Sequence, residues 1–264
     1  MSQRDGFEPG VPCWVATVQP DPEKAAGFYS ELFGWETTNL MPADHPGDYF
    51  LCKLRGRAVA AVVSQHGAPP PPLPVWGTYV QVESADETAA KVAEAGGSVI
   101  GQPFDSPAGG RQAVLADPAG AVFCAWEPGE HKGAQVVNEP NAWAMSALAS
   151  PDPEGAKRFY GEVFGWEADA FGDMTLWRLP GFVGGEPQQP VPRDVVATML
   201  PPNDAPPHWM VDFWVPDVDE AAAKAKELGG DTIVRPFEPI PGFRTAVLAD
   251  PHGAAFSVSK VPQG

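Results

Sequence analysis

The chain has 264 residues, of which 44% are hydrophobic, so it is long enough for one large or two ordinary globular domains and is not of disordered composition. Its 34 acidic residues outnumber 17 Lys and Arg, and a net charge of −17 repels phosphate backbones and anionic lipid, so we expect no nucleic-acid and no membrane partner. A polar start, the lack of an apolar run of about 18–20 residues, and three widely spaced cysteines without a CxxC motif predict a cytoplasmic protein with no disulfide frame.

The first elements in chain order are a strand and a helix. The sequence CWVATV (13–18) indicates a strand. Asp21 and Pro22 then have the spacing of a helix cap and first helical residue, and apolar residues follow at spacings of three and four. Gly34 ends this predicted helix.

The next elements follow a proline-rich connector, GAPPPPLP (67–74), which we expect to be stiff and not a strand. A strand is predicted at 76–83, a helix at 85–97, and hydrophobic strands at 112–117 and 121–126. Each side of the connector therefore has the order strand, helix, then two or three strands.

The second part of the chain repeats the first. DPEKAAGFYSELFGW (21–35) returns as DPEGAKRFYGEVFGW (152–166), and residues 96–120 match residues 229–253. Connectors recur at 186–193 and 200–207, and Asp217 and Glu220 have capping-box spacing before the last helix. This pattern predicts a tandem duplication of about 130 residues, with domains at 8–130 and 138–262 and four βαβββ modules in two pairs.

The predicted fold class is α+β, with helices on one face of each sheet and the other face curled into a cup. The repeated helix is scaffold in this interpretation, and Trp35 and Trp166 just after it are expected to anchor the core. The sequence leaves open whether modules are exchanged between copies, and whether the chain is a monomer or a homodimer.

The paired modules, the D-P-E-x-A-x-x-F-Y-x-x-x-F-G-W helix and the closing L-A-D-P-x-G-A turn resemble the vicinal oxygen chelate superfamily. That superfamily includes glyoxalase I, extradiol dioxygenases and bleomycin-resistance proteins, and the tandem form is similar to two-domain actinobacterial proteins often labelled hydroxylases. The resemblance implies a curved-sheet cup in each domain. In enzymatic members it also implies a divalent metal held there by His, Gln and Glu.

The family pattern places the metal ligands at six positions of this chain. These positions hold no His, Gln, Asp or Glu: they are Trp14, Gly77 and Cys124 in the first copy, and Met145, Met210 and Ser257 in the second. Divalent metals need clustered nitrogen, oxygen or thiolate donors, which Trp, Gly and Met do not supply. We therefore expect no metal site and no cofactor, which argues against glyoxalase and dioxygenase chemistry.

Strand alternation predicts which side chains line each cup. Those expected to bind a ligand are Trp14, Tyr79, Gln81, Cys124 and Trp126 in the first copy, and Trp143, Met145, Met210 and Trp214 in the second. His208 and Asp212 share the face of Met210, about 13 Å apart along the strand, so they are candidate catalytic or anchoring groups but not a dyad. For His208 the alternative is a solvated residue at the strand edge.

Arg111 and Arg244 recur at the same repeat position, after a glycine-bearing loop. Arginine can clamp a ligand carboxylate or fix a loop by pairing with an acid. Because both copies keep the arginine while the cup residues differ, we favour the structural pairing.

Three hypotheses for function follow. The first is a metal-free protein that binds a small hydrophobic or aromatic metabolite or antibiotic in a Trp-rich cup, as in sequestration or resistance. The second is a metal-independent tailoring enzyme of secondary metabolism, a cyclase, isomerase or hydroxylase-like protein, with Asp212 or His208 as general base. The third is an interaction protein whose cups are filled. The two cups are expected to bind unequally because their polar linings differ.

Overall fold

A computed structural model describes residues 3–64, 74–184, 193–201 and 205–260. The proline-rich connectors at 67–74 and 186–193 lie almost wholly outside these residues, as does part of 200–207. The described chain folds as two tandem α+β domains, each a curled mixed sheet with two helices, which confirms the predicted fold class.

The first copy contains two modules with the predicted order of elements. The first module is β1 (Pro12–Gln19), α1 (Pro22–Phe33), β2 (Glu36–Asn39), β3 (Tyr49–Leu54) and β4 (Arg57–Ser64). The second is β5 (Val75–Gln81), α2 (Ala85–Glu94), β6 (Ser98–Val99), β7 (Phe104–Ser106), β8 (Gly110–Ala116) and β9 (Val122–Pro128).

The second copy repeats this order. Its first module is β10 (Trp143–Ala149), α3 (Pro153–Phe164), β11 (Glu167–Phe171), β12 (Met174–Arg178) and β13 (Val195–Met199). Its second module is β14 (His208–Trp214), α4 (Val218–Glu227), β15 (Asp231–Ile240), β16 (Phe243–Ala249) and β17 (Ala255–Lys260).

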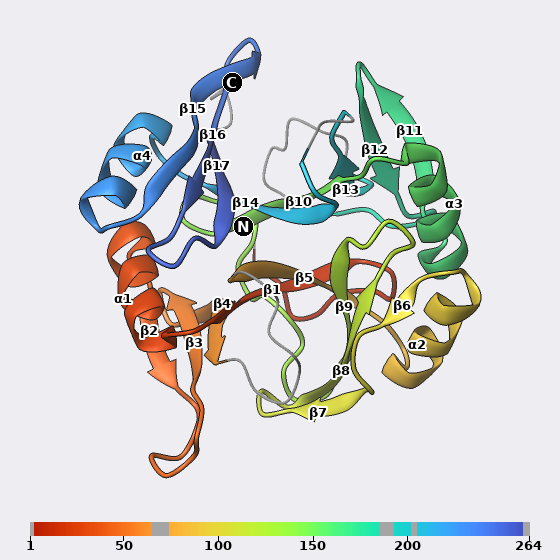
Figure 1. Cartoon of the computed structure of the whole chain (residues 1–264), viewed down its shortest axis with the longest axis horizontal. Helices are drawn as coiled ribbons and strands as arrows, with labels where there is room; N and C mark the ends of the chain where they lie inside the picture. Colours follow the sequence, from red (N-terminus) through yellow and green to blue (C-terminus); the bar gives the residue numbers. More distant parts are fainter. Residues whose placement is uncertain (1–2, 65–73, 185–192, 202–204, 261–264) are drawn as a thin grey trace.

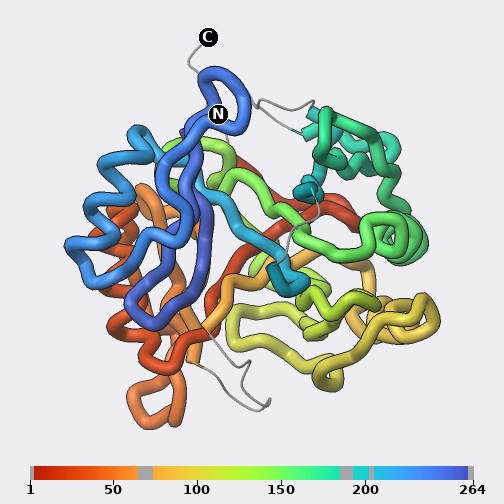
Figure 2. The backbone as a smooth tube through the Cα atoms, turned by 45° about the horizontal axis from the view of Figure 1, so that its top comes forward, coloured from red at the N-terminus to blue at the C-terminus, as the bar shows by residue number. Residues whose placement is uncertain are grey.

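Each sheet is built within one copy, so the modules are not exchanged. The strand order is β2-β3-β4-β1-β5-β9-β8-β6 in the first sheet, with β7 on β8, and β11-β12-β13-β10-β14-β17-β16-β15 in the second. The sheets lie back to back, with β5 against β14, while α1 lies beside α4 on one flank and α2 beside α3 on the other (Figure 1). Figure 2 follows the same two copies along the backbone. The two cups therefore open in opposite directions.

The helices begin and end where the sequence predicts. Asp21 caps α1, accepting a hydrogen bond from the backbone N–H of Lys24, and Asp152 caps α3 in the same way. Both helices end at a glycine in the left-handed region, Gly34 with φ 72° and Gly165 with φ 73°. No helix among the described residues is long and apolar enough to cross a membrane.

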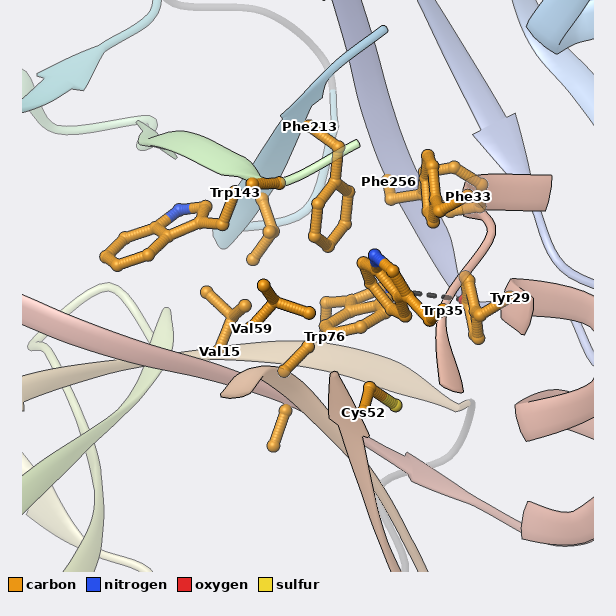
Figure 3. Close-up of a cluster of buried hydrophobic side chains, with 14 of the residues drawn as sticks. Val15, Tyr29, Phe33, Trp35, Cys52, Val59, Trp76, Trp143, Phe213 and Phe256 are labelled. Carbon is orange, nitrogen blue, oxygen red and sulfur yellow. Dashed lines mark hydrogen bonds between the residues drawn. The ribbon is translucent and has the colours of Figure 1, made fainter. Parts of the chain in front are cut away.

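A hydrogen-bonded tyrosine on each repeated helix joins the two copies. Tyr29 Oη on α1 accepts from Trp76 Nε1 at 2.9 Å and donates to Asp250 Oδ2 of the second copy at 2.9 Å. Figure 3 shows Tyr29 beside Trp76 in the aromatic cluster that fills this flank. Gln19 Nε2 gives the same Asp250 oxygen a second donor, at 2.6 Å.

The other flank has the equivalent chain of bonds. Tyr160 Oη on α3 accepts from Trp209 Nε1 at 2.9 Å and donates to Asp117 Oδ2 of the first copy at 3.1 Å. Asp117 Oδ1 accepts backbone N–H groups of its own turn. The tyrosine of the F-Y pair in the repeated helix and the Asp of the L-A-D-P turn are therefore partners across the copies.

The two tryptophans after the repeated helices are core anchors, as predicted. Trp35 Nε1 donates to Asn141 O at 2.8 Å and Trp166 Nε1 to Gly10 O at 2.7 Å, so each binds the segment that enters the other copy's first strand. Both side chains are buried.

Tyr160→Phe should destabilise the protein more than Tyr29→Phe. Loss of either hydroxyl leaves a buried indole N–H without a partner. Loss of the Tyr160 hydroxyl also removes the one side-chain donor to Asp117 Oδ2 among the described residues, whereas Asp250 keeps its bond from Gln19. We expect the free energy of unfolding to fall by about 2–4 kcal/mol for Tyr160→Phe and about 1–3 kcal/mol for Tyr29→Phe, measured by urea denaturation. Equal losses, or the reverse order, would contradict this account of the bonds.

Candidate functional site

The strand β14 divides its side chains between the two faces of the second sheet. Trp209, Val211 and Phe213 are buried between the copies. The alternate residues, His208, Met210, Asp212 and Trp214, lie on the cup face and are half-buried. This face of the second copy is therefore partly open, and it is the part of the chain that we consider as the candidate site.

Asp212 is held by two serine hydroxyls of the neighbouring strand β17. Ser257 Oγ donates to Asp212 Oδ1 at 2.7 Å, and Ser259 Oγ donates to Asp212 Oδ2. The parallel register places Asp212 beside Ser257, and Ser259 is two residues further on the same face. Each carboxylate oxygen has one strong donor and keeps acceptor capacity for a ligand.

Burial raises the pKa of Asp212 to about 6, and the bonds from Ser259 and Ser257 oppose that rise. A carboxyl group with this pKa exchanges a proton close to neutral pH, so it can act as an acid, a base or a hydrogen-bonding anchor. Desolvated carboxyl groups in a partly open cup are candidates for function.

Two methionines lie near the carboxylate, Met145 on the neighbouring strand β10 and Met210 on β14 itself. Met145 pairs with Asp212 across β10 and β14, and Met210 pairs with Ala147. Both are half-buried on the cup face, where unbranched thioether side chains adapt to different ligand shapes. Trp214 pairs with Ser259 at the end of the strand and is also half-buried. These three side chains and Asp212 share the cup face as predicted.

His208 lies at the opposite end of β14 from Trp214. Its Nδ1 is 2.7 Å from Pro206 O, and its strand partner is Ala149. His208 therefore does not hydrogen-bond Asp212, in agreement with the expected separation, and its ring nitrogen contacts the segment that precedes the strand.

The cup of the first copy is filled by its own side chains. Trp14 and Trp126 are each 1% exposed. The ring of His131, from the segment between the copies, contacts both, with ring centroids 4.4 Å from Trp14 and 5.5 Å from Trp126. Trp126 Nε1 also donates to His131 O, and burial lowers the pKa of His131 to about 4.

The other residues predicted to bind a ligand in the first copy are also enclosed. Tyr79 and Cys124 are strand partners and both are buried. Gln81 Nε2 donates to Phe7 O, so its side chain fixes the N-terminal arm. The first cup thus brings together the side chains that the sequence places there, but as packed core.

The expected orientation of Trp143 is wrong. A register shift between Trp143 and Met145 places an extra residue in β10, which breaks the alternation of side chains. The Trp143 side chain is therefore buried with Val15 and Phe213 in the cluster between the copies, not beside Met145 in the cup (Figure 3). The matching shift in β1 lies between Pro12 and Trp14.

The residues at the six family metal positions do not fit a divalent metal. In the parts of the chain that the structure describes, no group of three or more His, Cys, Asp and Glu side chains could hold a metal ion. Strand pairing places Ser257 beside Asp212 in the second cup, where one carboxylate stands among hydroxyl and thioether groups. One carboxylate is not a donor set for such an ion.

Arg111 and Arg244 have the predicted structural role. Arg111 Nε is 2.6 Å from Asp86 Oδ2, and Arg244 Nε is 2.5 Å from Asp219 Oδ2, so each ties a strand, β8 or β16, to the first turn of the helix of its own module, α2 or α4. Neither guanidinium is directed to a ligand site by these bonds.

Sequence reasoning missed the serine pair and the histidine. The family pattern gives Ser257 only as a lost ligand position. The parallel pairing of its strand with β14, which places Ser257 beside Asp212 on a shared face, is the signal that indicates the hydrogen bond. His131 lies in a segment without periodicity, and no local pattern indicates that it enters the first cup.

Comparison with known proteins supports this architecture. Residues 14–126 and 145–259 both match the family described as "Glyoxalase-like domain". The chain is 35% identical to the candidate glyoxylase CFP32 of Mycobacterium tuberculosis (strain CDC 1551 / Oshkosh), over 98% of each chain. It is 33% identical to the anthracycline biosynthesis protein DnrV of Streptomyces peucetius, over 98% of this chain and 96% of that protein.

Solved structures share the fold at low sequence identity. The Mn(II)-bound glyoxalase from Novosphingobium aromaticivorans has a TM-score of 0.63 and 19% identity, over 96% of this chain and 83% of that one. The 2,3-dioxygenase LapB from Pseudomonas sp. KL28 has a TM-score of 0.63 and 12% identity, over 97% of this chain and 94% of that one. Identities this low support the fold and not a shared activity.

Asp212→Asn should remove a pH dependence of stability. The folded state raises the pKa of Asp212 from 3.8 to about 6, so between these values the folded chain binds more protons than the unfolded chain. The contribution of this group to stability is therefore present at low pH and lost as pH rises through about 6. A pKa difference of about two corresponds to about 3 kcal/mol, an upper bound because the cup is partly open.

The measurement is urea denaturation of both proteins at several pH values across this window. We expect Asp212→Asn to be more stable than the parent at pH 7.5 and to lose that advantage towards pH 4. Comparison with the parent cancels contributions from other groups, such as His131. Asp44→Asn, at an exposed loop carboxylate, is the matched control. A constant difference at all pH values would show that the cup does not perturb Asp212.

Proposed function

The chain belongs to the glyoxalase-like domain family, and from that premise we propose that the cup of its second copy binds a small aromatic or otherwise hydrophobic metabolite without a metal ion. The carrying observation is Asp212, a carboxyl group bonded to Ser257 and Ser259 on a half-buried face. Its neighbour Ser257 occupies the position at which the superfamily pattern places a metal ligand, so a hydrogen-bonding anchor stands where a metal would.

The surroundings of Asp212 favour a flat, largely apolar ligand. Met145, Met210 and Trp214 offer polarisable and aromatic surface on the same face. A hydroxyl or amine group of the ligand would donate to Asp212. Enclosed apolar surface with a few convergent polar groups is the usual composition of a small-molecule site.

In this proposal the two cups have different roles, one structural and one in ligand binding. Trp14, Trp126 and His131 occupy the first cup, so it stabilises the fold and does not take a ligand. We therefore propose one site per chain. The sequence predicts that the two cups bind ligand unequally, and the proposal goes further: only the second cup binds it.

A tailoring enzyme is the second candidate, favoured by the pKa of Asp212. At about 6 it suits a general base or acid working near neutral pH. Relatives whose names place them in anthracycline biosynthesis, 33% and 34% identical to this chain, also favour a role in secondary metabolism. In that case Asp212 would accept a proton from a phenol or an activated C–H group of a bound aromatic substrate. His208 is the less favoured base, because it contacts Pro206 O.

Binding of 1,8-dihydroxyanthraquinone, a flat tricyclic phenol, tests the first proposal. Titration calorimetry and tryptophan fluorescence should give one site per chain, unaffected by EDTA. Asp212→Ala should weaken binding by about 10–100-fold, the usual cost of losing a hydrogen bond to a charged group. Tyr79→Phe, at the equivalent position of the first copy, is the matched control and should bind as the parent does. Two equal sites, or loss of binding with EDTA, would overturn the proposal.

Mass spectrometry of the same mixtures separates binding from turnover. An unchanged probe, with an affinity that depends on Asp212, supports a binding protein. Conversion of the probe that is lost in Asp212→Asn while binding persists supports the enzyme, since loss of a general base typically costs about 10²–10⁴ in rate.

A further inference from the structure

A second, smaller site lies at the seam between the copies. The cavity has a volume of about 50 Å³. Its lining comes from the N-terminal arm (Arg4 and Phe7), the start of β1, the segment before β10 (Val137 and Asn138), the start of β10 and the start of β13. About 10–15 Å³ is enough for one water molecule, so the cavity can hold a group of a few heavy atoms. The lining combines apolar side chains such as Val11 and Val195 with a few polar ones.

Two buried polar atoms in this lining have no hydrogen-bond partner among the described residues. They are Trp143 Nε1, a donor, and Asn138 Oδ1, an acceptor, on side chains that are each 5% exposed. The backbone N–H of Asn138 donates to Trp143 O at 2.9 Å, which fixes the two residues beside each other. Buried groups of this kind normally have partners, so a donor and an acceptor left open in one cavity indicate something that bonds to both.

The same cavity carries positive charge. Arg4 is half-buried in the lining and forms no ion pair with another described residue. Burial and the nearby Arg193 both lower the pKa of Arg4, so a second cation lies close to it. In a chain of net charge −17, the half-buried Arg4 guanidinium beside an unbonded indole N–H favours an anion.

We propose that this seam cavity binds a small 2-hydroxycarboxylate. The carboxylate accepts from Arg4 and from Trp143 Nε1, and the hydroxyl group donates to Asn138 Oδ1. The planar guanidinium fork matches a carboxylate, and the apolar part of the lining receives the carbon chain. A single water molecule could hydrogen-bond to both Trp143 and Asn138, but it would leave the Arg4 guanidinium without a counter-charge. Asp212 does not line this cavity, so the site is distinct from the anchor proposed for the second cup, although Met145 belongs to the lining of both.

Nuclear magnetic resonance of the full chain tests this with lactate as the probe. The protein has nine tryptophans, and Trp143→Phe identifies the indole N–H signal of Trp143 in a ¹⁵N-labelled sample. Lactate should shift that signal with saturation, whereas lactamide, its neutral analogue, should not. Arg4→Gln should weaken lactate binding at least about tenfold, and Arg158→Gln, which makes the same charge change on an exposed helix residue, should leave it unchanged.

A second comparison tests the hydroxyl contact. Asn138 has φ 57°, so Asn138→Gly removes the side chain and keeps a backbone that glycine adopts readily. Lactate should bind the parent more tightly than propionate, and this preference should vanish in the variant. A Trp143 signal that lactate leaves unmoved up to about 20 mM, well above millimolar dissociation constants, would overturn the proposal and leave a water site. Inorganic phosphate binding in place of lactate would also overturn it.

Discussion

The arrangement of this chain depends on one hydrogen-bonded relay, made twice: an indole N–H, a helix tyrosine and a turn aspartate. Tyr29 reaches Asp250 and Tyr160 reaches Asp117, so each helix is bonded to the copy to which it does not belong. In a buried setting a polar chain of this kind is stable only when all members are satisfied. It therefore specifies one way of placing the two sheets back to back, where hydrophobic contact alone would allow several. The aromatic cluster around each tyrosine buries apolar surface between the copies, and the hydrogen-bonded relay fixes how the two sheets are positioned relative to each other.

Fixing the backs of the sheets leaves the cups free to differ. Strand pairing places Tyr79, Cys124 and Trp126 of the first cup where the second has Asp212, Ser257 and Ser259. The first set is packed core, closed by a histidine from the segment between the copies. The second set holds a carboxyl group whose burial opposes ionisation. In the proposed function, a chain that keeps such a group in one copy, while the other replaces it with aromatic packing, separates stability from ligand contact on a duplicated scaffold.

Local sequence patterns predict most of the fold and part of the candidate site. The Asp21 cap, the Gly34 stop and the alternation along β14 follow from short-range chemistry, and the structure agrees with each. Prediction failed where position depends on the other copy or on a bulge. One extra residue in β10 turned Trp143 away from the cup, and no periodicity records such an insertion. The partners of Tyr29 and Tyr160 are more than 40 residues away in sequence or in the other copy, beyond any local signal.

The same pseudo-symmetry accounts for the seam cavity. The repeat offset of 131 residues that relates Trp35 to Trp166 places Arg4 opposite Gln135. Gln135 bonds both backbone groups of Ala58, near the start of β4. The strand registers relate Ala58 to Val195, beside which Arg4 lines the cavity. A guanidinium has five donors and no acceptor, so Arg4 cannot accept the backbone N–H that the Gln135 side chain accepts. This difference between equivalent positions places a guanidinium group in the cavity at the second copy's seam, where we propose that the carboxylate binds.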